Sequence, residues 1–200
     1  MKKFFHIIGY NFQGNNLNFL KKFSGWWQCM TTSAWMLMSL YSGNIKATDD
    51  NALAAYLDDV EAEIGKPGIA EWVKRKYSWI KGRTSLWWLV QKHGIEKWLW
   101  HQGIRGTAKF YNKTMTYEIL LRVLPDHPVM IGTNKIGGLP GGHIILAIGF
   151  DENQNIICHD PAGNATTKYK NRNGSMVVYP VEYLHKFTGD KFYALHWVTI

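Results

Sequence analysis

The sequence predicts an α+β fold with a helical N-terminal half and a C-terminal half built of strands. Apolar residues recur at helical spacing as far as Leu124, whereas the chain beyond Pro125 contains runs rich in β-branched and aromatic residues. Of the 200 residues, 46% are hydrophobic and 14% aromatic, which excludes a disordered chain and suffices for one domain with its own core. Because no internal repeat, low-complexity tract or linker interrupts the chain, we expect residues 1–200 to form a single domain.

Helical periodicity is clearest over residues 31–41, where Ala34, Leu37, Met38 and Tyr41 fall at positions i, i+3, i+4 and i+7. Cap and stop signals of the same kind predict further helices at 51–64, 69–80, 85–93 and 116–124.

Strands are expected at 128–133, 143–150, 155–160, 174–179 and 193–200, with a short helix at 181–187. The polar run at 151–154 predicts a tight turn that joins the second and third of these strands into a hairpin.

No apolar run approaches the ~18 residues of a membrane span, and the apolar stretch at the N-terminus is too short for a signal peptide. The two cysteines, Cys29 and Cys158, are too few for a disulfide framework. We therefore expect a protein made in the cytoplasm, without export by a signal peptide and with free thiols.

The net charge of +8 is concentrated in one part of the chain. Residues 74–113 hold ten Lys or Arg and one acid, Glu96, together with five of the ten tryptophans. This basic segment predicts a Trp-rich helical insert at about 66–113 and a partner that is anionic, such as nucleic acid, acidic lipid or a cell-wall polymer. The alternative is that the tryptophans belong to the core and the lysines to its solvated rim.

Cys29 immediately precedes the first clear helix and is a candidate nucleophile. A thiol of ordinary pKa is only about 3% ionised at pH 7. The N–H groups of a helix N-terminus and a nearby imidazolium both favour the thiolate. A buried structural cysteine is the alternative and the commoner case.

His143 opens an apolar strand just after the glycine-rich segment 136–142, a position that suits a general base at the edge of a cleft. The next strand ends at Asp160, and in a tight hairpin the two open ends lie side by side. Asp160 would then orient the imidazole of His143. The alternative is that Asp160 and Pro161 form only a turn at the end of the strand and that His143 is a rim histidine without a catalytic role.

These residues resemble those of a known family. The run Cys29-x-x-Thr32-Ser33-x-x-Met36 is similar to the nucleophile helix of papain-like cysteine peptidases, and most similar to the group of the bacteriocin-processing (double-glycine leader) peptidases. Residues 116–131 resemble the segment before that group's catalytic histidine. The resemblance covers residues 10–41 and 116–163.

Gly142-His143 and His159-Asp160-Pro161 resemble the histidine strand and the Asp-Pro motif of the same group. The resemblance implies a papain-like cysteine peptidase fold, whose nucleophile helix packs on the C-terminal antiparallel sheet. It also implies that Cys29 is the nucleophile, His143 the general base and Asp160 the residue that orients it.

The resemblance further implies a glutamine that stabilises the oxyanion. In the family this glutamine lies upstream of the cysteine, and Tyr10-Asn11-Phe12-Gln13-Gly14-Asn15 fits its pattern, so we favour Gln13. Gln28, next to Cys29, is the competing candidate. The sequence departs from the family at Met30 and Thr31, where Gly-Pro is common. The resemblance therefore does not predict the conformation of the turn before the helix.

No spacing of histidines and cysteines indicates a metal site, and we expect neither metal nor cofactor. Cys158 shares strand parity with Asp160, and we interpret it as a structural thiol. The Gly-Gly pairs lack the strand–loop–helix context of a phosphate site.

A Cys-His-Asp site supports hydrolysis of an amide bond through a thioester. We therefore expect a cysteine peptidase or amidase. The basic segment and the missing signal peptide favour a hydrolase that cleaves bacterial cell-wall peptidoglycan after its release, as a phage endolysin does, rather than one that acts on nucleic acid. One alternative is a cysteine protease or deamidase effector that acts on proteins or peptides. A second is a catalytically idle papain-like module that binds an anionic polymer.

Overall fold

The structure is a computed structural model that describes residues 3–15, 29–41, 93–94, 96–98, 100–101, 103 and 106–199. The helices expected at 51–64 and 69–80, and nearly all of the one expected at 85–93, lie outside the described residues. The same holds for most of the basic segment.

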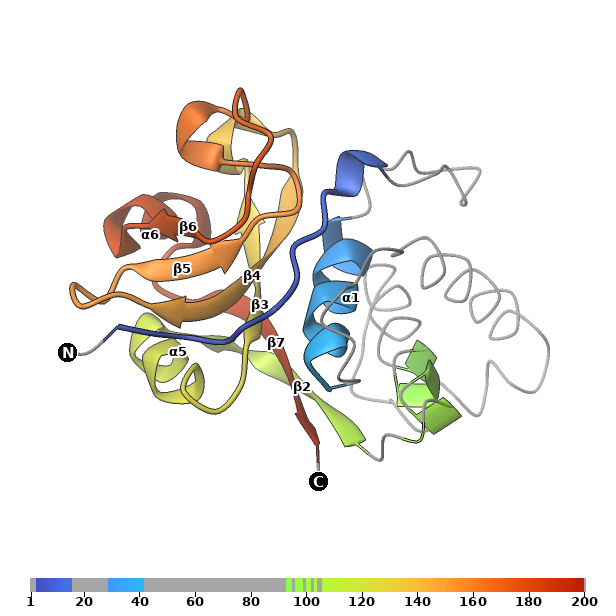
Figure 1. Ribbon diagram of the computed structural model, residues 1–200. Coiled ribbons are helices and arrows are strands. Elements are labelled where there is room, and N and C mark those ends of the chain that lie inside the picture. Colours follow the sequence, from blue (N-terminus) through green and yellow to red (C-terminus); the bar gives the residue numbers. More distant parts are fainter. Residues whose placement is uncertain are drawn as a thin grey trace.

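An antiparallel sheet forms the centre of the described part of the chain (Figure 1). Six strands are hydrogen-bonded in the order β2-β7-β3-β4-β5-β6, and β1 pairs with the end of β4 at Gly149 and Phe150. The strands are β1 (Phe4–Phe5), β2 (Gly106–Met115), β3 (Val129–Asn134), β4 (Gly142–Phe150), β5 (Ile156–His159), β6 (Val177–Tyr179) and β7 (Phe192–Thr199).

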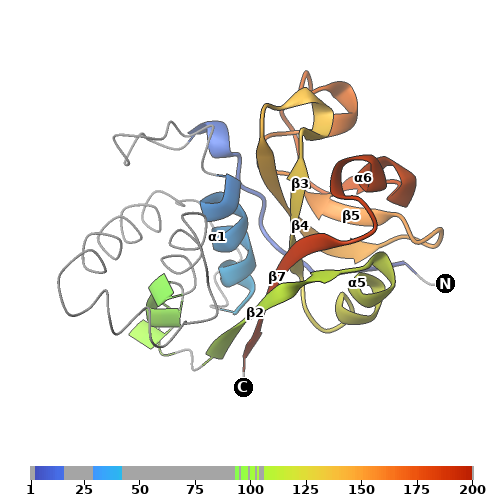
Figure 2. The same cartoon turned by 180° about the vertical axis from the view of Figure 1, so that it is seen from behind.

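Helices lie on both faces of this sheet. Figures 1 and 2 show α1 (Cys29–Tyr41) on one face, against β4, and α5 (Tyr117–Val123) and α6 (Val181–Thr188) on the other. Three short 3₁₀ helices are also described, η1 (Gln13–Asn15), η3 (Ile136–Gly138) and η4 (Ala165–Thr167), and residues 93–94, 96–98 and 100–101 are α-helical. The fold is therefore α+β, as the sequence predicts.

The main core lies between the sheet and the pair α5 and α6. Alternate residues of β3 and β4 point to this side, and they pack against apolar side chains of the two helices: Val129, Ile131, Ile145, Ala147, Leu120, Leu124 and Leu184. Thr116 is the N-cap of α5, since its side chain accepts a hydrogen bond from the backbone N–H of Ile119. The predicted helix at 116–124 is thereby confirmed.

The predicted strands all form, and their ends differ from the expected ones by one or two residues except in β6, which starts at Val177. The hairpin is confirmed, since β4 and β5 pair antiparallel across the turn at 151–154. The interpretation of 66–113 as helical is wrong for its last residues, because 106–113 belong to β2. β2 pairs with β7, so its partner lies more than 75 residues along the chain and leaves no local signal.

None of the helices in the described ranges is long and apolar enough to cross a membrane.

Candidate active site

Cys29 is the first residue of α1, and its side chain is half-buried where the helix meets the beginning of β4. A hydrogen bond ties the two elements together here, since the hydroxyl of Ser33 donates to the carbonyl oxygen of Ile144 at 3.3 Å. The thiol thus lies at a helix N-terminus and beside the strand that carries His143.

The pKa of Cys29 lies below its ordinary value. Burial acts to raise this pKa, but the hydrogen bond and the charge of His143 lower it, as do hydrogen bonds from the backbone N–H groups of Ile144 and Met30. Because the lowering effects prevail, the site favours the thiolate.

His143 and Asp160 form the hydrogen-bonded pair that the hairpin predicts. His143 Nε2 lies 2.8 Å from Asp160 Oδ1, and the two side chains are only 3% and 0% exposed. Because Nε2 donates to Asp160, the ring nitrogen left for the thiol of Cys29 is Nδ1. A second bond fixes the strand at this point, where Thr133 Oγ1 donates to the carbonyl oxygen of His143 at 3.0 Å.

The surroundings of His143 favour its charged form. Burial acts to lower the pKa of His143, but the charge of Asp160 and its hydrogen bond, together with the Cys29 thiolate, raise it to about 10. Both shifts point the same way, to a thiolate–imidazolium pair between Cys29 and His143.

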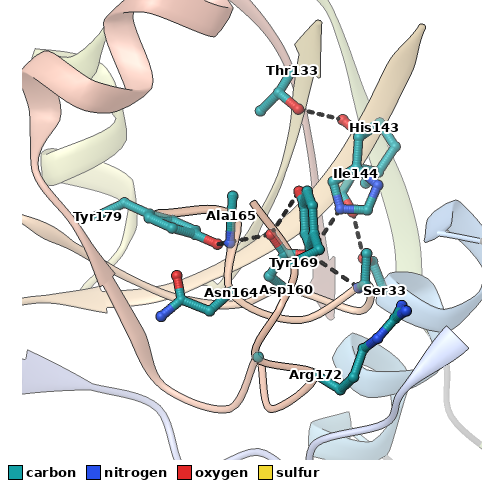
Figure 3. Close-up of polar contacts among 12 residues, drawn as sticks. Ser33, Thr133, His143, Ile144, Asp160, Asn164, Ala165, Tyr169, Arg172 and Tyr179 are labelled. Carbon is teal, nitrogen blue, oxygen red and sulfur yellow. Dashed lines mark hydrogen bonds and ion pairs between the residues drawn. The ribbon is translucent and has the colours of Figure 1, made fainter. Parts of the chain in front are cut away.

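The carboxylate of Asp160 accepts hydrogen bonds at both oxygens. Oδ1 accepts from His143 and, at 3.0 Å, from the backbone N–H of Ala162. Oδ2 accepts from the hydroxyls of Tyr179 at 2.8 Å and Tyr169 at 3.3 Å. Figure 3 shows the two tyrosines reaching the carboxylate from different directions. The sequence analysis missed both tyrosines, because neither lies at a fixed spacing from Asp160.

Residues 3–15, which we call the N-terminal segment, run from β1 to the site (Figure 1). Along the way, His159 Nε2 donates to the carbonyl oxygen of Ile8 at 2.9 Å, and the backbone N–H of Met176 donates to His159 Nδ1 at 3.1 Å. The pair of bonds fixes the neutral tautomer of His159 and ties the segment to β5. His159 is therefore buried and structural.

Gln13 lies at the end of this segment, in η1. Its side chain is 1% exposed, and its backbone N–H donates to the carbonyl oxygen of Pro161 at 2.8 Å. Figures 1 and 2 both show η1 beside the end of α1 at which Cys29 lies. The structure thus places Gln13 between the nucleophile helix and the turn after Asp160, whereas Gln28 lies outside the described residues.

A cavity of about 310 Å³ borders His143 on the side of β3. Its walls come from the adjoining ends of β3 and β4, from the end of α6 and from the start of β7 with the residue before it: Gly132, Thr133, Asn134, Gly142, His143, Ile144, Phe187, Thr188, Lys191 and Phe192. A mainly apolar recess beside the ring is a place where part of a substrate would fit.

Two tryptophans of the basic segment are described, and they lie in different surroundings. Trp98 is half-buried, and its ring lies 5.7 Å from that of Trp35 of α1 in a T-shaped arrangement. Trp100 is 67% exposed. The first behaves as a packing residue, and the second is available to a partner.

No group of three His, Cys, Asp or Glu that would hold a metal ion occurs among the residues that the structure describes. Cys158 is buried, and burial, followed by the charge of Asp160, raises its pKa well above the ordinary value. The thiol of Cys158 is therefore protonated and unreactive.

The chain matches a known family. The model of the Peptidase_C39 like family matches residues 13–184, a stretch that contains Gln13, Cys29, His143 and Asp160. This match agrees with the resemblance of the sequence to papain-like cysteine peptidases. No curated protein matches the chain.

Proposed function

The chain belongs to the Peptidase_C39 like family, and from this premise we propose that it is a cysteine peptidase or amidase that hydrolyses amide bonds. The observation that carries the proposal is the chain of contacts from Cys29 through His143 to Asp160. A thiol of lowered pKa, a protonated imidazole and a carboxylate 2.8 Å behind that imidazole form a nucleophile, an acid–base group and its orienting partner.

In the first half of the reaction, the Cys29 thiolate attacks the carbonyl carbon of the amide and forms a tetrahedral oxyanion. The imidazolium of His143 then gives the proton on Nδ1 to the leaving nitrogen. The C–N bond breaks, the amine departs, and the acyl group remains on Cys29 as a thioester.

In the second half, the neutral imidazole of His143 takes a proton from water as the water oxygen attacks the thioester. The C–S bond breaks, the carboxylic acid leaves, and the thiolate–imidazolium pair is restored. Throughout, Asp160 keeps Nδ1 directed at the sulfur and stabilises the positive charge on the ring.

The backbone N–H of Cys29 and the side-chain amide of Gln13 are proposed to donate to the oxyanion. The burial of Gln13 next to the Asp160–Pro161 turn supports this role. Gln28 remains the competing donor. Losing one such donor lowers turnover by about 10²–10³.

We propose peptidoglycan of the bacterial cell wall as the substrate, with the enzyme acting at the wall after its release, as an endolysin does. The net charge of +9 over residues 74–113 supports an anionic surface as partner, and the exposed ring of Trp100 supports contact outside the catalytic site. The lowered pKa of Cys29 speaks against a catalytically idle binding module.

The test compares the wild type with Cys29→Ala on isolated sacculi from several wall types and, in parallel, on a panel of proteins and peptides. Wild type is expected to clear turbidity and release new amine termini, and the variant to do neither. Equal activity of the two would refute the catalytic assignment. Thiol-dependent cleavage of the protein panel alone would refute the wall substrate and support a protein-directed protease.

A further inference from the structure

The Asp160 carboxylate is fully buried and receives four hydrogen bonds, of which two come from tyrosine hydroxyls on Oδ2. Tyr179 ends β6, and Tyr169 lies in the loop after η4. The oxygen that faces away from His143 therefore has donors of its own.

The hydroxyl of Tyr179 has a fixed direction. Its oxygen accepts a hydrogen bond from the backbone N–H of Ala165 at 2.9 Å, so its own proton is free to be given to Asp160 Oδ2 at 2.8 Å. Burial, and then the charge of Asp160, raises the pKa of Tyr179 far above its ordinary value. The side chain thus stays a neutral donor across the range in which an enzyme works.

Tyr169 supports the same oxygen through a longer bond of 3.3 Å. It also faces the imidazole, with its ring centroid 6.0 Å from that of His143 in a T-shaped arrangement. Tyr169 therefore contacts both members of the His143–Asp160 pair.

We propose that Tyr179, supported by Tyr169, is a positioning residue that holds the side chain of Asp160 in place with its Oδ1 directed at His143. The proposal rests on the proposed function, since it assigns these residues to the same site. A buried carboxylate is stable as an anion only if donors replace its lost water. His143 and Ala162 donate to Oδ1, and the two tyrosines donate to Oδ2.

The consequence passes through His143 to the thiol. If Oδ2 loses a donor, the carboxyl group of Asp160 is held less firmly against His143 and stabilises the imidazolium less. The imidazolium in turn stabilises the Cys29 thiolate less. The reactive ion pair then survives only at higher pH.

The experiment uses the full chain with Tyr179→Phe, Tyr169→Phe and the double variant. Tyr183→Phe is the matched control: its ring stacks on Tyr179 at 5.7 Å, and its hydroxyl is hydrogen-bonded to the backbone of Gly137, while the charge of Asp160 reaches it without a hydrogen bond. Two readouts are measured across pH. The first is kcat/KM on whichever of the tested substrates, sacculi or proteins, the wild type hydrolyses, and the second is the rate at which iodoacetamide alkylates Cys29. Thermal unfolding is followed in parallel.

For Tyr179→Phe we expect the acidic limb of both profiles to move to higher pH by about one unit. At neutral pH kcat should fall by up to about 10-fold with little change in KM, because a shift of one pH unit changes the population of the ion pair by at most about a factor of ten. Tyr169→Phe should give a smaller shift, the double variant the largest, and Tyr183→Phe none.

Profiles of Tyr179→Phe that coincide with those of the wild type would overturn the proposal, even if the melting temperature fell, because a purely structural role would change stability alone. The alkylation readout needs no substrate. A shift in alkylation without any hydrolysis would therefore support the positioning role while refuting the proposed function.

Discussion

The hydroxyl of Tyr10 donates a hydrogen bond to the carbonyl oxygen of Asp160 at 3.1 Å, across 150 residues of sequence. The same hydroxyl accepts from the backbone N–H of Gly174 at 3.1 Å. Tyr10 thereby joins the N-terminal segment to both ends of the loop that follows Asp160. Gln13, three residues on, is fixed against Pro161 in that same loop.

The two cysteines are expected to react very differently. Cys29 has a lowered pKa and is half-buried, whereas Cys158 is buried with a raised pKa. Iodoacetamide at pH 7 should label Cys29 at least a hundredfold faster, since only the thiolate reacts. Mass spectrometry of the digested protein measures both sites. Comparable labelling of Cys158 in the folded protein would contradict its assignment as a structural thiol.

The reactivity of Cys29 should depend on His143 in a pH-specific way. The thiolate–imidazolium pair exists above the lowered pKa of Cys29 and below the raised pKa of His143, about 10. Alkylation of the wild type should therefore be fast at neutral pH. In His143→Ala, burial without the imidazolium raises the pKa of the thiol, so the rate should be low at neutral pH and climb only in alkali. Identical profiles for the two proteins would exclude the ion pair.

Substitutions of the two glutamines separate the candidates for the oxyanion site. Gln13→Ala should lower kcat about 10²–10³-fold with a small effect on KM, because the donor acts mainly in the transition state. Gln13→Glu, which keeps the shape of the side chain but removes the N–H donor, should lower kcat by a similar factor. Gln28→Ala is the matched comparison and should retain most of the activity. The reverse ranking would transfer the role to Gln28.

Acid should loosen the N-terminal segment through His159. Burial lowers the pKa of His159, against the opposing effect of the bond to Ile8. In the unfolded chain the pKa of His159 has its ordinary value of about 6.5. Below this pH the unfolded chain binds the proton more readily than the folded protein does, so the free energy of unfolding should fall as the pH drops. Protonation of His159 at Nδ1 would also remove the acceptor of the hydrogen bond that the backbone N–H of Met176 donates.

The variant His159→Phe tests this coupling by denaturant unfolding at several pH values. The free energy of unfolding should fall by about 1–3 kcal/mol at pH 7, because the carbonyl oxygen of Ile8 and the N–H of Met176 lose their partner, and the loss of stability below pH 6.5 should become flatter. The pKa of His6 is also lowered by burial, so a double variant with His6→Phe should be flatter still. An unchanged slope would rule out His159 as a source of the acid sensitivity.

Because Gly174 has no side chain, the end of the loop after Asp160 can lie directly against the backbone of Asp160. A Cβ at this position would collide with the carbonyl oxygen of Asp160, whereas at Gly142 the nearest atom lies at 3.8 Å. Gly174→Ala should therefore lower stability by about 1–3 kcal/mol, and Gly142→Ala by much less. Thermal unfolding of the two variants measures the difference, and equal melting temperatures would contradict the close approach.

The sequence predicts the pair His143 and Asp160 because local signals suffice for it. A polar turn at 151–154 and two apolar strands define the hairpin, and a hairpin brings its open ends together. Cys29 is predictable for a similar reason, since it marks the start of a helix whose apolar spacing is clear.

The rest depends on contacts between distant parts of the chain. β2 carries Lys109, Asn112 and Lys113 and has little strand character of its own, and it forms because β7 pairs with it. Tyr169 and Tyr179 meet Asp160 only once η4 and β6 are in place. No periodicity in a single sequence encodes where a hydroxyl points in such a loop.

The path of the N-terminal segment has a consequence for how the protein folds. Its bonds to Asp160, Pro161 and Gly174 join residues about 150 positions apart, and closing loops of that length is slow compared with forming a helix or hairpin. During synthesis, Gln13 would leave the ribosome long before the loop that holds it exists. Catalytic competence should therefore arise late, as one of the last events in folding, and a nascent chain that stops before Gly174 should carry a cysteine but no working site.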